Sequence, residues 1–409
     1  MTRPLRVGFL STYPPTICGI ATFTQDLAEA VAVNLSSSPK ILAVSQNEEV
    51  ISYPNEVTFV IQKESKKDYL EAAEKANYSL DLVNIQHEYG IFGGKDGELL
   101  LNFLENLKKP AVTNLHTVLH QPSPNQARIL KRIGQISQKI VVMNSLAIPI
   151  LEEKYGISPE KVIVIPHGAP ADDLSPEKTK YLLGLTGKFV VSTFGLINRG
   201  KGLEYVLWAL PKVVQKFPQI VYLILGTTHP KVKQEEGESY REFLEQLVKE
   251  LKLEKNVIFV NRYLSKKELV QYLVATDVYI TPYLNQQQIV SGTLAYAIRF
   301  GKVIISTPYL YAQELIGKDR GILVEMANPK SIEDALFYLL ENPTRFHQIR
   351  EKTKKFGVKF KWSEVGKEYI RLFEKIVYSW LSPSLYPDQK SLVLTEKNSA
   401  YNAKTTPYH

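Results

Sequence analysis

One stretch decides the fold: Phe189-Val-Val-Ser-Thr-Phe-Gly195-Leu-Ile-Asn-Arg199-Gly-Lys201-Gly202. A β-rich run leads into a turn with three glycines and two cations, and residues with apolar positions at helical spacing then continue to Phe217. Glycines let the backbone approach a ligand closely, and cations at the amino end of a helix neutralise bound negative charge. The stretch therefore predicts a strand, a diphosphate-binding turn and a helix. It matches neither a Walker loop nor a GxGxxG fingerprint, so ATPase and dehydrogenase activities lose their main support.

The same alternation of β-rich runs and helical stretches extends in both directions along the chain, as in parallel α/β folds. At 409 residues the chain exceeds what one core normally holds. We therefore predict two Rossmann-like doubly wound domains, residues 1–170 and 188–358, joined by a polar, turn-rich connection over 169–187. Residues 382–409 have the composition of a disordered tail. Strands are expected at 5–10, 41–45, 82–86, 111–115, 140–143, 162–165, 189–194, 221–225, 257–260, 278–281 and 303–306, and a second-half helix at 240–251.

The charge is unevenly distributed. Residues 1–180 hold 18 Lys and Arg against 20 Asp and Glu, whereas residues 181–380 hold 29 against 20. The basic excess favours a polyanionic ligand in the second half, with a solvated helical face over residues 345–361 as the alternative. No nucleic-acid recognition motif accompanies the charge, so nucleic acid is not expected as a partner.

The location expected from the sequence is cytoplasmic. Cys18 is the single cysteine, which fits a reducing compartment. Neither a signal sequence nor a membrane-spanning stretch is visible. Peripheral contact with the inner membrane face stays open, since Arg128, Lys131 and Arg132 are candidates for meeting an anionic bilayer.

In the first half, candidate site residues follow the expected strands, because ligands of doubly wound sheets bind beyond the carboxyl ends of the strands. Gly19 precedes a helix whose amino end can hold a phosphate, although glycine in such a turn is often only geometric. Residues 87–89, His-Glu-Tyr, follow one strand and His116 follows the next. A structural hydrogen bond is the alternative role for His116, and a hinge role competes with ligand binding for His167.

In the second half, a helix begins after the strand at 278–281 with small and amide-rich residues. These are Gln288 and the run Ser291-Gly292-Thr293, followed by Tyr296. We interpret this helix start as a second place for phosphate oxygens.

Taken in order, these landmarks resemble the GT-B retaining glycosyltransferases of family 4, also called group 1, over about residues 5–380. Each motif is weak alone, and the ordered set is specific. The closing segment from Phe360-Lys-Trp-Ser to Ile376 is similar to the family's last helices, which would complete the first domain near 360–380. The matching motifs are Gly19, His116, Ile165-Pro-His-Gly168, Gly195…Arg199-x-Lys201-Gly202 and Ser306-Thr-Pro…Glu314…Gly321-Ile-Leu-Val.

The resemblance implies a retaining hexosyltransferase with a nucleotide-diphosphate sugar in the cleft between the domains. Arg199 and Lys201 would hold the diphosphate in place of a metal, so no metal or other cofactor is expected. Gly19 would touch the diphosphate from the first domain, and His116 would position the sugar and stabilise the transition state. Glu314 is carried over as a donor-binding residue. The mechanism implied is same-face displacement without a protein nucleophile.

One departure from the family pattern concerns its two glutamates around the donor sugar and ribose. Gln288 and Tyr296 stand at those positions, and Ser291-Gly-Thr-Leu-Ala-Tyr-Ala297 resembles the form of a bacterial subgroup. Glu88 is a candidate for the missing carboxylate, toward the sugar or the acceptor hydroxyl.

Several questions stay open at this point. GDP-mannose is the donor suggested by the subgroup, which would make the protein a mannosyltransferase, for example in polysaccharide biosynthesis; a UDP-hexose is the alternative. The acceptor, a carbohydrate, a lipid-linked compound or a small molecule, is expected near residues 13–19, 116–124 and 87–94, with His87 and Tyr89 on its side. A nucleotide-sugar 2-epimerase, using Glu88, His116 and Glu314, and a non-catalytic nucleotide-sugar-binding protein are the competing functions.

Overall fold

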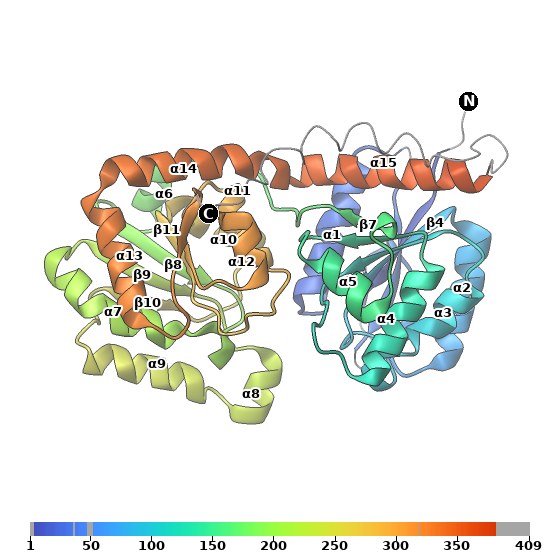
Figure 1. Ribbon diagram of the computed structural model, residues 1–409, viewed down its shortest axis with the longest axis horizontal. Coiled ribbons are helices and arrows are strands. Elements are labelled where there is room, and N and C mark those ends of the chain that lie inside the picture. Colours follow the sequence, from blue (N-terminus) through green and yellow to red (C-terminus); the bar gives the residue numbers. More distant parts are fainter. Residues whose placement is uncertain (1–3, 36, 47–51, 318, 382–409) are drawn as a thin grey trace, which may run out of the picture.

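The computed structural model describes residues 4–35, 37–46, 52–317 and 319–381 and contains two parallel sheets (Figure 1). The first has seven strands in the order β3-β2-β1-β4-β5-β6-β7, and the second has six in the order β10-β9-β8-β11-β12-β13. In both, the order reverses beside the first strand of the sheet, which is the doubly wound arrangement. The predicted tail at 382–409 lies outside the described residues.

The strands of the first sheet are β1 (Val7–Ser11), β2 (Lys40–Ser45), β3 (Val57–Gln62), β4 (Leu82–His87), β5 (Ala111–Leu115), β6 (Lys139–Val142) and β7 (Val162–Val164). Those of the second are β8 (Phe189–Phe194), β9 (Ile220–Leu225), β10 (Val257–Val260), β11 (Val278–Thr281), β12 (Val303–Ser306) and β13 (Gly321–Leu323). Every strand predicted from the sequence is present, with its ends within two residues. The edge strands β3 and β13 were not predicted.

The helices flank both sheets (Figure 1). They are α1 (Gly19–Ala32), α2 (Lys66–Ser79), α3 (Leu100–Asn106), α4 (Pro124–Ile136), α5 (Ala147–Tyr155), α6 (Pro176–Leu182), α7 (Leu203–Lys216), α8 (Pro230–Glu236), α9 (Ser239–Glu250), α10 (Lys266–Ala275), α11 (Gly292–Arg299), α12 (Leu310–Ile316), α13 (Pro329–Glu341), α14 (Pro343–Gly357) and α15 (Trp362–Leu381). Helix α6 is a difference from the sequence, because it lies in the segment expected to be a turn-rich connection. Ser175 caps its amino end through a hydrogen bond from Lys178 N, and Pro176 occupies its first position.

The central strands are buried, which explains why the sequence predicted them. Strands β1, β4 and β9 are buried along their whole length. Such strands read as nearly continuous apolar runs, because helices cover both faces of a parallel sheet. Among the described residues, no helix combines the length and apolar character that crossing a bilayer requires.

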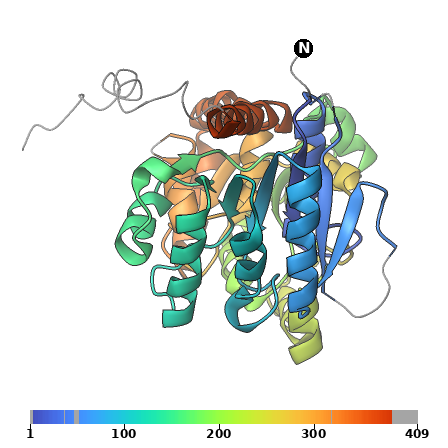
Figure 2. The same ribbon diagram turned by 90° about the vertical axis from the view of Figure 1, so that its right-hand side faces the viewer.

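The chain crosses between the two sheets twice, at neighbouring places. Ala169 pairs with Lys361 in an isolated parallel bridge, and Gly168 lies so close to Trp362 that a Cβ there would be 2.0 Å from the indole ring. After the second crossing, α15 packs on the first sheet beside α1, as seen along the upper edge of Figure 1 and end-on in Figure 2. Phe373 of α15 meets Phe9 of β1 with ring centroids 6.4 Å apart. Helix α15, the last described helix, thus packs with β1, the first strand of the chain.

Candidate active site

The turn after β8 presents the two predicted cations in different ways. A 3₁₀ turn, Arg199–Lys201, ends at Gly202, which has φ of 61° and precedes α7. A Cβ at Gly202 would stand 2.4 Å from Pro282 O, so glycine is required there. Lys201 Nζ lies 3.8 Å from the centroid of the Tyr283 ring, which holds the ammonium in place. The Arg199 side chain is 59% exposed, forms an ion pair with Glu236 at 3.5 Å and lies 5.4 Å from the centroid of the Tyr240 ring.

The start of α11 lies next to this turn. The Tyr283 hydroxyl is hydrogen-bonded to Thr293 Oγ1 at 2.9 Å, and Thr293 Oγ1 lies 3.0 Å from Ser291 Oγ. A Cβ added to Gly195 would be 3.4 Å from the Thr293 methyl group. The structure therefore joins the two segments of the second half that the sequence singled out as phosphate sites.

The other two residues predicted around α11 point elsewhere. The Gln288 amide donates to Val290 O at 2.8 Å within its own loop. The Tyr296 side chain is buried, and its hydroxyl donates to Asp26 Oδ2 at 3.3 Å. In this conformation Tyr296 contacts the first half of the molecule instead of presenting its hydroxyl to solvent.

In the first half, Gly19 opens α1, whose amino end is capped by Cys18 through a hydrogen bond from Ala21 N to Sγ at 3.3 Å. A Cβ at Gly19 would meet no atom within 4 Å. Packing within the described residues therefore does not require glycine at this position, and the backbone there is open to close approach by a ligand.

His116 and His167 pack on the same aromatic ring. Each lies with its ring centroid 4.9 Å from that of Phe23, and Trp362 closes the group at 5.3 Å from Phe23. Burial lowers the pKa of His116 to about 3, assisted by His167 and His87, and lowers that of His167 to about 4. Both imidazoles are therefore neutral at physiological pH.

His167 also touches the second half. Its Nδ1 is hydrogen-bonded to Gly168 O at 2.7 Å, and a Cβ on Gly292 would be 2.9 Å from its Nε2. His167 thus lies against the first residue of α11, where both the hinge role and the ligand role remain compatible with its place.

His87 and Tyr89 lie inside the core, which differs from their expected acceptor-side position. His87 has no exposed surface, and Tyr89 is 8% exposed. Burial lowers the pKa of His87 to about 4, and neither of its ring nitrogens has a hydrogen-bond partner among the described residues. The Tyr89 ring packs edge-on against it at 4.9 Å. Neither side chain is available to an acceptor in this conformation.

Glu88 bonds to the residue that follows His116. Its Oε2 accepts a hydrogen bond from Thr117 Oγ1, and its Oε1 accepts one from Tyr89 N at 3.1 Å. Burial raises the pKa of this carboxyl, although the two hydrogen bonds oppose the effect.

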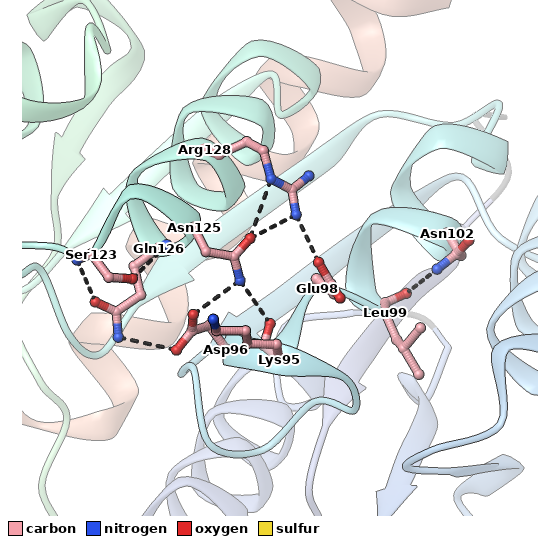
Figure 3. Close-up of polar contacts among 9 residues, drawn as sticks. All are labelled: Lys95, Asp96, Glu98, Leu99, Asn102, Ser123, Asn125, Gln126 and Arg128. Carbon is pink, nitrogen blue, oxygen red and sulfur yellow. Dashed lines mark hydrogen bonds and ion pairs between the residues drawn. The ribbon is translucent and has the colours of Figure 1, made fainter.

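The loop after Glu88 is fastened to the amino end of α4 (Figure 3). Asp96 accepts from Asn125 Nδ2 at 2.9 Å and from Gln126 Nε2 at 3.3 Å. Arg128 forms an ion pair with Glu98 at 2.7 Å. These contacts join the segments that follow the expected acceptor loops, and the loops themselves are joined where His116 N donates to His87 O at 3.0 Å. Of the three cations considered for a bilayer, Arg128 and Arg132 are engaged in ion pairs with Glu98 and Glu105.

Contacts between the two halves form what we call the seam, which consists of Asp26, Ser145 and His167 on the first side and Lys266, Gly292, Tyr296 and Glu314 on the second. Glu314 Oε2 accepts from Ser145 N at 2.6 Å and from Ser145 Oγ at 3.0 Å, at the amino end of α5. Predicted as a donor-binding residue, Glu314 here contacts the first half.

Asp26 was not singled out in the sequence, yet it joins four elements. It is 2% exposed on α1 and accepts hydrogen bonds from Trp362 Nε1 at 3.1 Å, from the Tyr296 hydroxyl and from Lys266 Nζ. Its partners lie more than 200 residues away along the chain, so no local pattern identifies it.

A row of buried polar residues on β4 and β5 was also missed: Asn84, Gln86 and Asn114, which continue to His116. The available signal was the spacing, since amide side chains or histidine stand two residues apart at 84 and 86 and at 114 and 116, in strands rich in apolar residues. Among the described residues, no group of three or more His, Cys, Asp or Glu side chains is arranged to hold a metal ion.

Comparison with known proteins adds a sequence match in the second half. Residues 177–356 match the family described as "Glycosyl transferases group 1". A D-inositol 3-phosphate glycosyltransferase of Corynebacterium urealyticum is 24% identical over 269 residues, covering 62% of this chain and 60% of that protein. The spore coat protein SA of Bacillus subtilis is 24% identical over 207 residues, covering 49% and 52%. The chain thus spans little more than half the length of these relatives.

Solved structures share the fold over nearly the whole described chain. Anabaena HepE in complex with UDP superimposes with a TM-score of 0.73 at 15% identity, covering 91% of this chain and 100% of that one. Sucrose-phosphate synthase from Thermosynechococcus elongatus gives 0.71 at 17% identity, with coverage of 91% and 100%. The two doubly wound sheets are thus those of a GT-B glycosyltransferase structure, as predicted. The family match is confined to residues 177–356, and the solved structures show the fold.

Proposed function

We propose that this protein transfers a hexose from a nucleotide-diphosphate sugar to a hydroxyl acceptor, with retention of configuration and without a metal ion. One observation carries the proposal: Lys201 is held over Tyr283 beside Thr293, where the turn after β8 meets the start of α11. A fixed ammonium, open glycine backbone and a helix amino end together suit a diphosphate.

Lys201 and Arg199 supply the positive charge that a metal ion supplies in other transferases. In the reaction, the bond between the anomeric carbon and the diphosphate oxygen breaks, and negative charge grows on the leaving diphosphate. The acceptor hydroxyl attacks the same face, and its proton passes to the diphosphate. Cations that already stand beside the leaving group stabilise this charge without reorganisation, so they lower the barrier.

His116 and Glu88 are the proposed sugar-side groups. His116 is neutral, so its contribution is hydrogen bonding and not charge. Glu88 accepts a hydrogen bond from Thr117, the residue that follows His116. Burial raises the pKa of the Glu88 carboxyl, which suits a group that binds a substrate hydroxyl through a hydrogen bond. The donor diphosphate would approach Gly19 at the amino end of α1 as the two halves close.

Two observations bear on the donor base, and they favour different nucleotides. The resemblance of residues 291–297 to a bacterial subgroup favours GDP-mannose, whereas the structures of HepE contain UDP, and one contains UDP-glucose. The acceptor is proposed to be a carbohydrate, a lipid-linked compound or a small alcohol, as in polysaccharide biosynthesis at the cytoplasmic face of a membrane. The 2-epimerase and non-catalytic alternatives gain no support from the comparisons.

The test is a calorimetric and thermal-shift titration with UDP, GDP, ADP and their sugar conjugates, carried out with EDTA. Saturable binding of one diphosphate, weakened by Arg199→Ala, is expected and would name the donor. Lys212→Ala is the control, because Lys212 of α7 is 70% exposed and pairs with Glu333 of α13 instead of with the turn after β8. A requirement for a divalent cation, or equal loss of binding in both variants, would refute the proposed diphosphate site. Release of free nucleotide that depends on an acceptor would favour the transferase, whereas conversion of the nucleotide sugar to its epimer without net release of nucleotide would favour the epimerase.

A further inference from the structure

Four polar side chains stand in a row on one face of the first sheet. Asn84 and Gln86 alternate along β4, and Asn114 and His116 alternate at the end of β5. Gln86 is paired with Asn114 in the parallel register, so the four share a face. Asn84, Gln86 and Asn114 have no exposed surface. Buried amides are costly unless each polar atom is bonded, which makes their bonding pattern informative.

The hydrogen bonds of this row run in one direction. The His116 ring bonds Gln86 Oε1 through Nε2 at 2.9 Å, and Gln86 Nε2 donates to Asn84 Oδ1 at 2.5 Å. Asn84 Nδ2 donates to Asn114 Oδ1 at 3.1 Å, and Asn114 Nδ2 donates to the Tyr369 hydroxyl at 2.6 Å. The row thus extends from the end of β5 to the helix α15.

A backbone carbonyl fixes the direction. Asn84 Nδ2 also donates to Val112 O at 3.2 Å, and a carbonyl oxygen can only accept. The amide nitrogen of Asn84 must therefore face Val112, which leaves its oxygen facing Gln86. Gln86 must then present its own nitrogen to Asn84 and its oxygen to His116. The His116 nitrogen that meets this oxygen has to carry the proton.

We propose that Gln86, itself oriented by Asn84, is a positioning residue that fixes His116 as the Nε2–H tautomer and leaves Nδ1 to accept a hydrogen bond from a substrate hydroxyl. The assignment of a substrate to His116 rests on the proposed function. The tautomer itself rests only on the hydrogen bonds of the row.

The surroundings of His116 agree with a neutral, orienting ring. Phe23 packs edge-on against it at an interplanar angle of 87°, and His87 and His167 are the titratable neighbours that act on it. Glu88 bonds Thr117 and Tyr89 instead of the imidazole. Nδ1 accepts no hydrogen bond from any described residue, and it is not among the buried atoms that lack a partner, so it retains contact with solvent.

This tautomer selects the kind of group that His116 can meet. A neutral Nδ1 only accepts, so it suits a sugar hydroxyl and repels a carboxylate or phosphate oxygen. A site built to bond one hydroxyl discriminates strongly against an analogue that lacks it. Donor sugars that are deoxygenated, or oxidised to a uronate, at the contacted position should therefore be poor substrates.

The experiment is long-range ¹H–¹⁵N correlation on the full chain labelled with ¹⁵N-histidine, with the His116 signals assigned from their loss in His116→Gln. A protonated Nε2 and an unprotonated Nδ1 are expected in the native protein from about pH 6 to pH 8. Gln86→Met and Asn84→Leu should each produce a mixture of tautomers. The result for Asn84→Leu is the more discriminating one. Asn84 does not contact His116, so this substitution acts only by letting the Gln86 amide rotate.

Asn256→Leu is the matched control. Asn256 is a buried amide in the second sheet that donates to Pro218 O and Ile220 O, so its loss should lower stability without changing the His116 signals. An Nδ1–H tautomer in the native protein would overturn the proposal, as would an unchanged tautomer in folded Gln86→Met and Asn84→Leu.

A kinetic arm separates this proposal from the proposed function. With the donor and acceptor identified by titration, Gln86→Met should lower kcat about 10-fold and leave the affinity for the free nucleotide unchanged. An equal loss of nucleotide affinity would indicate a merely structural role for Gln86. If the native protein transfers no sugar although the tautomer is as predicted, the proposed function fails and the tautomer assignment stands.

Discussion

Replacing Asp26 by asparagine tests whether the seam depends on one carboxylate. Asp26 receives the Trp362 indole, the Tyr296 hydroxyl and the Lys266 ammonium. Asparagine has the same shape but keeps one acceptor oxygen and turns an amide toward the remaining donors. We therefore expect Asp26→Asn to loosen the contact between the two halves while each sheet stays folded.

The magnitude follows from the partners. A charge-assisted hydrogen bond contributes about 1.5–3 kcal/mol and a neutral one about 0.5–1.5 kcal/mol, so the bonds from Trp362 and Tyr296 lose about 1 kcal/mol each. The Lys266 side chain is 43% exposed, and solvent screening limits its contribution to about 1 kcal/mol. The seam should therefore lose about 3 kcal/mol, or about 100-fold in the equilibrium for opening.

Hydrogen–deuterium exchange read by mass spectrometry measures this opening. Faster exchange is expected in α1, in α11 and at the start of α15. Asp81→Asn is the control, because Asp81 is also buried and paired, with Arg6, but both residues precede strands of the first sheet. If Asp26→Asn left exchange along the seam unchanged while Asp81→Asn raised it in the first sheet, the reasoning would be refuted.

Three further predictions concern ligand binding and acid stability. Lys201→Ala should raise the Kd for a nucleoside diphosphate about 10- to 100-fold in calorimetry, whereas Lys212→Ala should not; equal effects would contradict a specific site. Gly19→Ala should leave the melting temperature unchanged, since its Cβ meets no atom, but should weaken donor binding; Gly202→Ala should lower the melting temperature because of its positive φ and the nearby carbonyl. His87 binds protons less readily when folded, with a pKa of about 4 against 6.5 for an exposed histidine, so stability should fall as pH drops from about 6.5 toward 4. His87→Phe should reduce this loss of stability, measured by urea denaturation at about pH 5. A pH dependence that the substitution leaves unchanged would show that His87 does not cause the loss.

The strands were the most predictable part of the molecule. Strands such as β9 are buried on both faces, so their apolar runs are continuous and leave a clear signal. Strand β3 was missed because it lies at the edge of its sheet, where most of its side chains are only partly covered. Helix α6 was hidden by the prolines and glycines on either side of it.

The site was predictable only as separate segments. The turn at 195–202 and the helix start at 288–296 were each found from local residue types, but only packing shows that Tyr283 joins them. The roles of Tyr296 and Glu314 depend on partners in the other half of the molecule, more than 160 residues away. Such partners follow from how the two sheets meet, which spacing within a strand or helix does not encode.

The return of α15 to the first sheet affects the order in which a ribosome can complete this protein. Gly366 lies so close to α1 that a Cβ would be 2.5 Å from Ala30 O, and Tyr369 ends the row of amides that begins at His116. Domains usually fold as units in the order in which they are synthesised. Here the contacts of α15 with Phe9 of β1 and with Asn114 of β5 cannot form until the whole second sheet has been translated. The first half is begun first and finished last, and a nascent chain stalled before Trp362 leaves Asn114 without its Tyr369 partner.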